Sequence, residues 1–234
     1  MSDRLPRISD PHAIPVVGVD DHLPPVPVDA LHPDALRERF SNPPVWKPEI
    51  SGDGKRFNLD REPSAAAVLV PLVMRDDGLH VLLTRRTDHL RDHAGQISFP
   101  GGRSEEHDPD AVATALRETE EEVGLGREYI EVIGHLPSYS TVTSYVVTPV
   151  VALVQPDFTL TLDPFEVAEA FEVPLQFLMT PAHHRRHVFE MLGQPRQFLS
   201  MPWSGIDPDG REREYFIWGA TAAMLRNLYG FVSS

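Results

Sequence analysis

The chain has 234 residues, which is enough for one domain with a substantial core and some elaboration. It contains no cysteine, which excludes a disulfide framework and thiolate chemistry, and its formal net charge of −14 argues against a general nucleic-acid-binding surface. No apolar run approaches the roughly 18–20 residues of a membrane span, and the N-terminal MSDRLPRISD lacks the apolar core of a signal peptide. We therefore expect a soluble, cytoplasmic protein without a nucleic-acid or membrane partner.

The chain begins with a proline-rich stretch. Residues 1–28 show no apolar periodicity, so we expect an extended arm that is ordered only where it packs on something. We place one folded domain at 29–234, which starts with a short helix over 29–40 and ends with an apolar helix over 220–230. A homodimer in which the arm and the C-terminal helix bury each other's apolar surface is one arrangement that this layout allows.

Several apolar runs have the length and composition of strands. Residues 65–74 and 79–84 flank a turn at 75–78 and predict a hairpin, in which Pro71 makes the first strand irregular or places it near an edge. Further strands are expected at 129–136, 145–154, 187–192, 196–203 and 212–219. Residues 163–178 read as a turn or short helix followed by a helix that begins near Pro174. This order predicts an α/β sandwich with a mixed β-sheet between helices.

A helix that carries a group of glutamates is expected just before Gly124. Apolar side chains recur with the 3.6-residue period of one buried face, at Val112, Ala115, Leu116, Thr119 and Val123. Asp108 or Asp110 can cap the N-terminus, and Gly124 ends the helix. Glu118, Glu121 and Glu122 then share a different face, while Glu120 points elsewhere.

The shared face of Glu118, Glu121 and Glu122 predicts a metal site. Like charges at this spacing repel each other, so the cluster gains stability only when a cation binds, and oxygen ligands suit Mg²⁺ or Mn²⁺. Arg117 can reach Glu120 or Glu121 along the helix and hold one carboxylate in place. The alternative is an acidic face that simply contacts water.

The segment from the Gly101–Gly102 turn to Leu125 resembles the Nudix box. The matching residues are Arg117, Glu118, Glu120, Glu121, Glu122, Gly124 and Leu125. The sequence departs from the family pattern at Thr119, where an aliphatic residue is usual, and in a loop one residue longer, which puts the early acidic position on Asp108 or Asp110. The resemblance implies a Nudix-type α/β/α sandwich and metal-dependent cleavage of a diphosphate, with Glu118, Glu121 and Glu122 as ligands of Mg²⁺ or Mn²⁺.

The residues before the box resemble the motif of the coenzyme A pyrophosphatases within the Nudix group. The match covers Leu82, Leu83, Thr84, Arg86, Thr87, Arg91, Gly95, Phe99, Pro100, Gly101 and Gly102, with Thr87 where serine or alanine is usual. Metal at the glutamate helix can neutralise a diphosphate, and other groups must bind the phosphate charge that the metal does not. Arginine is suited to forked contacts with phosphate, which makes Arg86 and Arg91 candidates for this role. Gly95, Gly101 and Gly102 allow close approach of the backbone.

The resemblance implies hydrolysis of coenzyme A or its thioesters to 3′,5′-ADP and 4′-phosphopantetheine or the acylated form. The catalytic residues would be Glu118, Glu121, Glu122 and Arg117, and substrate would contact Arg86, Arg91, Gly95, Phe99, Gly101 and Gly102. The general base stays open among Glu121, Glu118 and a downstream Glu166 or Glu169. Two alternatives are a Nudix hydrolase of ADP-ribose or a nucleoside triphosphate, and a Nudix-fold binding module without catalysis.

Overall fold

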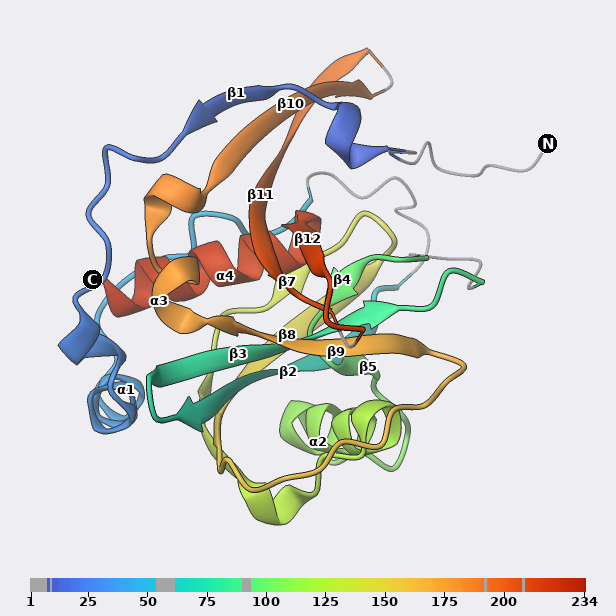
Figure 1. Ribbon diagram of the computed structural model, residues 1–234. Coiled ribbons are helices and arrows are strands. Elements are labelled where there is room, and N and C mark those ends of the chain that lie inside the picture. The colour runs from blue at the N-terminus through green and yellow to red at the C-terminus, as the bar shows by residue number, and fades with distance from the viewer. Residues whose placement is uncertain (1–7, 9, 54–61, 90–93, 192, 208) are drawn as a thin grey trace.

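Two β-sheets lie on either side of the C-terminal helix (Figure 1). The computed structural model describes residues 8, 10–53, 62–89, 94–191, 193–207 and 209–234. Within these residues, the larger sheet has eight strands and the smaller sheet has four. No helix in the described part of the chain is long and apolar enough to cross a membrane.

The larger sheet is mixed, because β2 and β8 run parallel while its other pairings are antiparallel. Its main path is β4 (Ile97–Ser98), β3 (Gly78–Arg86), β2 (Ser64–Arg75), β8 (Tyr145–Val154) and β6 (Ile130–His135). Three further strands pair with β2, β8 and β3 respectively, namely β5 (Gly101–Arg103), β7 (Tyr139–Ser140) and β9 (Val167–Pro174). The predicted hairpin of β2 and β3 and the strands at β6 and β8 are confirmed.

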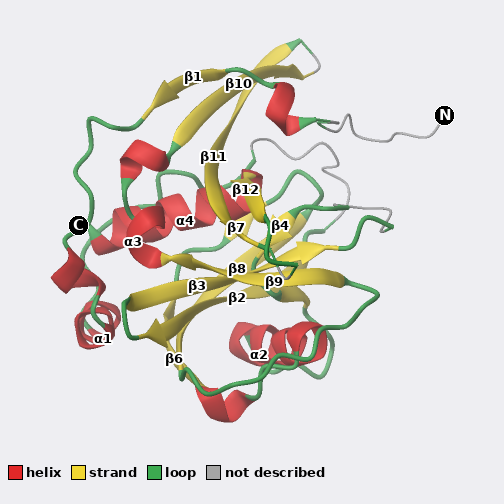
Figure 2. Ribbon diagram, viewed as in Figure 1, coloured by secondary structure: helices red, strands yellow, loops and turns green. Residues whose placement is uncertain are grey.

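The helices cover both faces of this sheet, which confirms the predicted α/β sandwich (Figure 2). The four α-helices of the described residues are α1 (Pro33–Ser41), α2 (Ala111–Val123), α3 (Leu175–Leu178) and α4 (Gly219–Val232), and short 3₁₀ turns lie at Pro11–Ala13, Val28–Leu31, Arg127–Tyr129 and Pro181–His183. Side chains alternate along β2, so that Ala67 and Leu69 pack toward α2 while Val70 and Leu72 join the main core with α4. The larger sheet therefore separates α2 from α4.

Pro71 lies in a central strand, so of its two predicted alternatives a place near an edge is wrong, while the strand is irregular in that its partner on one side changes beside Pro71. On one side β2 pairs with β8 along almost its whole length. On the other side it pairs with β5 as far as Val68 and with β3 from Leu72 onward. Pro71 lies between these two pairings, and its missing N–H therefore costs the sheet no ladder hydrogen bond.

The segment 163–178 differs from its prediction. A turn at 164–166 is followed by strand β9, and only the four residues of α3 are helical. β9 pairs antiparallel with β3. This pairing joins segments that are far apart in the sequence, and β9 itself shows only a short alternation of side chains. The sequence therefore did not predict the strand.

The smaller sheet is antiparallel and joins the two ends of the chain. Its order is β1 (Val16–Val19), β10 (Arg185–Met191), β11 (Gln194–Ile206) and β12 (Glu212–Trp218), so residues 16–19 of the proline-rich stretch form an edge strand. An ion network around the buried Arg226 and Asp20 connects this sheet to α4. The Arg226 guanidinium contacts Asp20 at 3.2 Å and Glu49 at 2.6 Å, and Arg186 donates hydrogen bonds to the same two carboxylates.

Candidate active site

The helix α2 begins and ends at the residues that its sequence indicates. The Asp110 carboxylate accepts a hydrogen bond from the Ala113 N–H at 2.8 Å, so Asp110 is the N-cap. Gly124 ends the helix in the left-handed conformation, with φ of 68°. Thr119 is buried, and its hydroxyl donates to the Ala115 carbonyl at 2.7 Å. A polar residue is tolerated at this usually aliphatic position because its hydroxyl is satisfied within the helix.

The three glutamates of the predicted metal face differ strongly in burial. The side chains of Glu122, Glu118 and Glu121 are 7%, 18% and 60% exposed. Glu120 points away from them, and its carboxylate contacts Arg127 at 3.3 Å. The three carboxylates thus share one face of α2 and Glu120 lies off it, as the spacing predicts, while packing makes their burial unequal.

Gly101 and Gly102, which the sequence predicts as a turn, instead begin strand β5 because they pair with Val68 and Ala67 of β2, and they pack directly against this face of α2. The Gly101 N–H donates to a Glu122 carboxylate oxygen at 3.1 Å. A Cβ on Gly102 would lie 2.7 Å from Glu118 Oε1, which is far inside normal contact distance. A Cβ on Gly101 would lie 2.5 Å from the Val68 Cα. Gly102 therefore makes room for the Glu118 carboxylate, and Gly101 makes room for the backbone of β2 at Val68. The neighbouring Phe99, 2% exposed, packs in the core.

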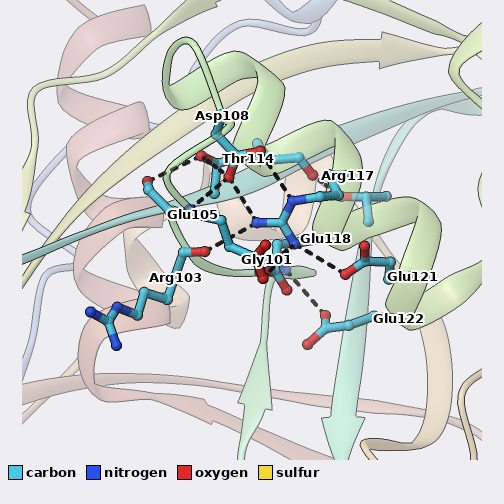
Figure 3. A network of polar contacts seen from close by, with 12 residues as sticks. Gly101, Arg103, Glu105, Asp108, Thr114, Arg117, Glu118, Glu121 and Glu122 are labelled. Carbon is cyan, nitrogen blue, oxygen red and sulfur yellow. Dashed lines mark hydrogen bonds and ion pairs between the residues drawn. The ribbon is translucent and has the colours of Figure 1, made fainter.

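Arg117 holds two of the glutamates in place (Figure 3). Its guanidinium donates to Glu118 at 2.9 Å and to Glu121 at 3.0 Å, and to the Arg103 carbonyl at 3.1 Å. It also makes a forked contact with Asp108, with Nε at 3.1 Å and Nη2 at 2.8 Å. The hydrogen bonds from Arg117 hold the pKa of the Asp108 carboxyl well below its usual range. The longer loop thus still brings Asp108 onto Arg117, while Asp110 serves as the cap.

Burial raises the pKa of the Glu122 carboxyl from its ordinary 4.5 to about 7. The Gly101 N–H and the charge of Arg86, which lower this pKa, compensate only in part, and Glu166 and Glu118 raise it further. Burial likewise raises the pKa of the Glu118 carboxyl, against the effect of Arg117. When Glu118 and Glu122 are ionised, neighbouring positive charges and hydrogen-bond donors therefore compensate their negative charge only in part.

Such a donor set fits a hard divalent cation, which takes carboxylate and carbonyl oxygens as ligands. In the described residues no three acidic or imidazole side chains form a ready cation cluster. The Glu118 and Glu121 carboxylates instead accept hydrogen bonds from the Arg117 guanidinium. The Glu121 side chain, 60% exposed, is not packed in the core.

The end of β3 brings Arg86 to the same place. Its Nη1 lies 3.6 Å from a Glu122 oxygen, and its Nη2 lies 3.5 Å from a Glu166 oxygen. Gly95, with φ of 68°, turns the chain behind this strand, where a Cβ would lie 3.0 Å from the Asp88 carboxylate. Arg91, the second predicted phosphate ligand, lies outside the described residues.

Glu166 and Glu169, which the sequence could not tell apart, lie on opposite faces of the sheet. Glu166 faces Arg86 and the α2 glutamates. Glu169 is 4% exposed, and its carboxylate accepts hydrogen bonds from the Tyr215 hydroxyl and, at 3.0 Å, from Arg213 on β12. Glu169 is thus turned away from α2, and of the two only Glu166 belongs to the candidate site.

Comparison with known proteins agrees with this geometry. The model of the family described as "NUDIX domain" matches residues 63–192. The chain belongs to the Nudix hydrolase family. Members of this family act on small molecules with the help of divalent metal ions.

Two relatives are similar over most of their length. One is the "Uncharacterized Nudix hydrolase NudL" of Shigella flexneri serotype 5b (strain 8401), 42% identical over 178 residues, which cover 74% of this chain and 86% of that protein. The protein of the same name from Escherichia coli (strain K12) is 44% identical over 165 residues, or 70% and 80% of the two chains. Among solved structures, the Nudix hydrolase RenU of M. smegmatis aligns with a TM-score of 0.43 and 23% identity, over 54% of this chain and 78% of that one.

Proposed function

We propose that this Nudix hydrolase cleaves the diphosphate of coenzyme A and its thioesters with Mg²⁺ or Mn²⁺. The products would be 3′,5′-ADP and 4′-phosphopantetheine, or the acylated form. The observation that carries the proposal is the position of Arg86, a residue of the coenzyme A motif, whose guanidinium lies 3.6 Å from Glu122. The glutamates that would hold the metal ion and the positively charged Arg86 therefore lie side by side. A substrate with several phosphates requires both kinds of positive charge.

Each residue of the site has a distinct part in this reaction. Glu118, Glu121 and Glu122 would hold the metal ion, which polarises the phosphoryl oxygens and lowers the pKa of the attacking water when bound. Arg117 orients Glu118 and Glu121. Arg86 binds the phosphate charge and Arg91 is proposed to do the same. One carboxylate must accept the proton of the water, and Glu118, Glu121 and Glu166 are the candidates on this face.

The direct test is incubation of the purified protein with coenzyme A and Mg²⁺ or Mn²⁺, followed by chromatography of the products. We expect 3′,5′-ADP and 4′-phosphopantetheine. ADP-ribose is run in parallel, because cleavage of ADP-ribose alone would keep the glutamate site and refute the assignment of coenzyme A. Cleavage of neither compound would refute both the substrate and its near alternative.

The role of the glutamates is tested by Glu118→Gln, Glu121→Gln and Glu122→Gln, each of which keeps the side-chain shape and removes the charge. Each substitution should lower kcat by about 100-fold or more, because charge on the reacting phosphoryl group is then less well stabilised. Glu120→Gln is the matched control, since Glu120 is on the same helix and faces away from the site. Near wild-type turnover in all three variants would remove the glutamates from the mechanism.

A further inference from the structure

The turn at residues 163–166 is hydrogen-bonded to two elements that carry active-site residues, the C-terminal end of α2 and the end of β3. On one side, the Asp163 N–H donates to the Glu122 carbonyl at 2.9 Å, which ties the turn to the C-terminal end of α2. Within the turn, the Phe165 N–H donates to the Asp163 carboxylate at 2.9 Å and the Val167 N–H donates to the Asp163 carbonyl at 2.8 Å. The turn therefore has a defined shape before it reaches the sheet.

On the other side, Thr87 attaches this turn to the end of β3 by two hydrogen bonds. Its hydroxyl donates to the Phe165 carbonyl at 2.8 Å, and its N–H donates to the Glu166 carbonyl at 3.0 Å. Thr87 is only 6% exposed, whereas the Phe165 side chain is 73% exposed and contributes little packing to the turn. Hydrogen bonds rather than buried apolar surface thus hold this side of the turn.

Arg86 depends on the same attachment. The pairing of β3 with β9 shifts register between Arg85 and Arg86, and such an irregularity redirects the side chains that follow it. Arg86 lies next to Thr87 in the chain, and its guanidinium is placed between Glu122 at 3.6 Å and Glu166 at 3.5 Å. A displacement of the turn would move Glu166 and with it the position of the Arg86 guanidinium.

We propose that Thr87 is a positioning residue of the active site, whose hydroxyl holds the 163–166 turn so that Glu166 and Glu122 orient Arg86 for a diphosphate. The inference rests on the proposed function in taking Arg86 as a group that binds phosphate charge. It is not limited to coenzyme A, because any substrate with a diphosphate at this face would need the same orientation of Arg86.

The test compares Thr87→Ser, which keeps the hydroxyl, with Thr87→Val, which keeps the shape and loses it. Thr221→Val is the matched control, because Thr221 is also 6% exposed and its hydroxyl donates to the Ile97 carbonyl at 2.9 Å from α4. Affinity for inorganic pyrophosphate is measured by calorimetry in the presence of Mg²⁺. Thr87→Val should weaken binding by roughly three- to tenfold, the usual effect of one hydrogen bond, while Thr87→Ser and Thr221→Val should bind as the wild type does.

A second comparison shows whether Thr87 acts through Arg86. In an Arg86→Ala background, Thr87→Val should cause no further loss of pyrophosphate affinity, since the group that it orients is absent. The proposal would be overturned if Thr87→Val lost the same pyrophosphate affinity in both backgrounds. It would also be overturned if Thr87→Val bound pyrophosphate as the wild type does, or if Thr221→Val lost as much affinity as Thr87→Val. On a diphosphate that the wild type cleaves, Thr87→Val should raise KM more than it lowers kcat, whereas Thr87→Ser and Thr221→Val should change neither.

Failure of the proposed substrate is distinguishable from failure of this inference. If coenzyme A is not hydrolysed but pyrophosphate affinity depends on the Thr87 hydroxyl and on Arg86, the substrate assignment falls and the positioning role stands. If coenzyme A is hydrolysed and pyrophosphate affinity is the same in Thr87→Val as in the wild type, the positioning role falls alone.

Discussion

Replacing Glu122 by glutamine should lower kcat by about 100-fold or more and, in the metal-free protein, increase the free energy of unfolding at alkaline pH. The Glu122 carboxylate is buried, and burial raises its pKa to about 7 because the charged form loses contact with water. A glutamine at this position can still accept the hydrogen bond from the Gly101 N–H, which is 3.1 Å from the carboxylate. It cannot ionise, and it therefore avoids the cost of a buried charge.

The sign and size of the effect follow from linkage between proton binding and folding. A carboxyl whose pKa is higher in the folded than in the unfolded chain stabilises the folded state at low pH, and this contribution is lost as the pH rises from 4.5 through 7. The shift corresponds to about 3 kcal/mol in all. Roughly 2 kcal/mol of this falls between about pH 5 and about pH 8.5.

The assay is urea unfolding of wild type and Glu122→Gln in EDTA at both pH values, with Glu120→Gln as the control. Comparing variant with wild type at each pH cancels other groups, such as His184, whose pKa burial lowers to about 4. The free energy of unfolding of Glu122→Gln, relative to that of the wild type, should increase by roughly 2 kcal/mol from the lower to the higher pH. Mg²⁺ should then stabilise wild type at the higher pH and leave Glu122→Gln nearly unchanged. A stability difference that does not vary with pH would refute the reasoning.

Two further substitutions test the Gly101–Gly102 pair and the ion network. Gly102→Ala should lower kcat/KM at least tenfold, because its Cβ would displace the Glu118 carboxylate; Gly18→Ala, with open space around it, is the activity control. Arg226→Met should lower the free energy of unfolding by about 3 kcal/mol in urea melts, because it leaves the buried Asp20 with one cation fewer, whereas Arg211→Met, at an exposed site, should change it by less than about 0.5 kcal/mol. Equal effects of the two arginine substitutions would contradict the importance of burial.

Local sequence was enough to predict α2 and the direction of its glutamates. The 3.6-residue period of the apolar side chains and the glycine at the C-terminal end act within a few turns of helix, without help from the rest of the chain. The same is true of the β2–β3 hairpin, whose turn residues and apolar strands are adjacent in sequence. The motif residues likewise indicated that Arg86 and the Gly101–Gly102 pair belong to one site.

Tertiary structure decided what the local patterns leave open. Spacing places Glu118, Glu121 and Glu122 on one face, but only packing against the Gly101–Gly102 pair buries Glu122 and raises its pKa. Glu166 and Glu169 are three residues apart in one segment, and the register of β9 with β3 and the contact with β12 put them on opposite faces. Pro71 costs the central strand β2 no ladder hydrogen bond, because β2 changes its partner from β5 to β3 beside this residue. These outcomes depend on residues far apart in the sequence, and such contacts leave no periodic signal along the chain.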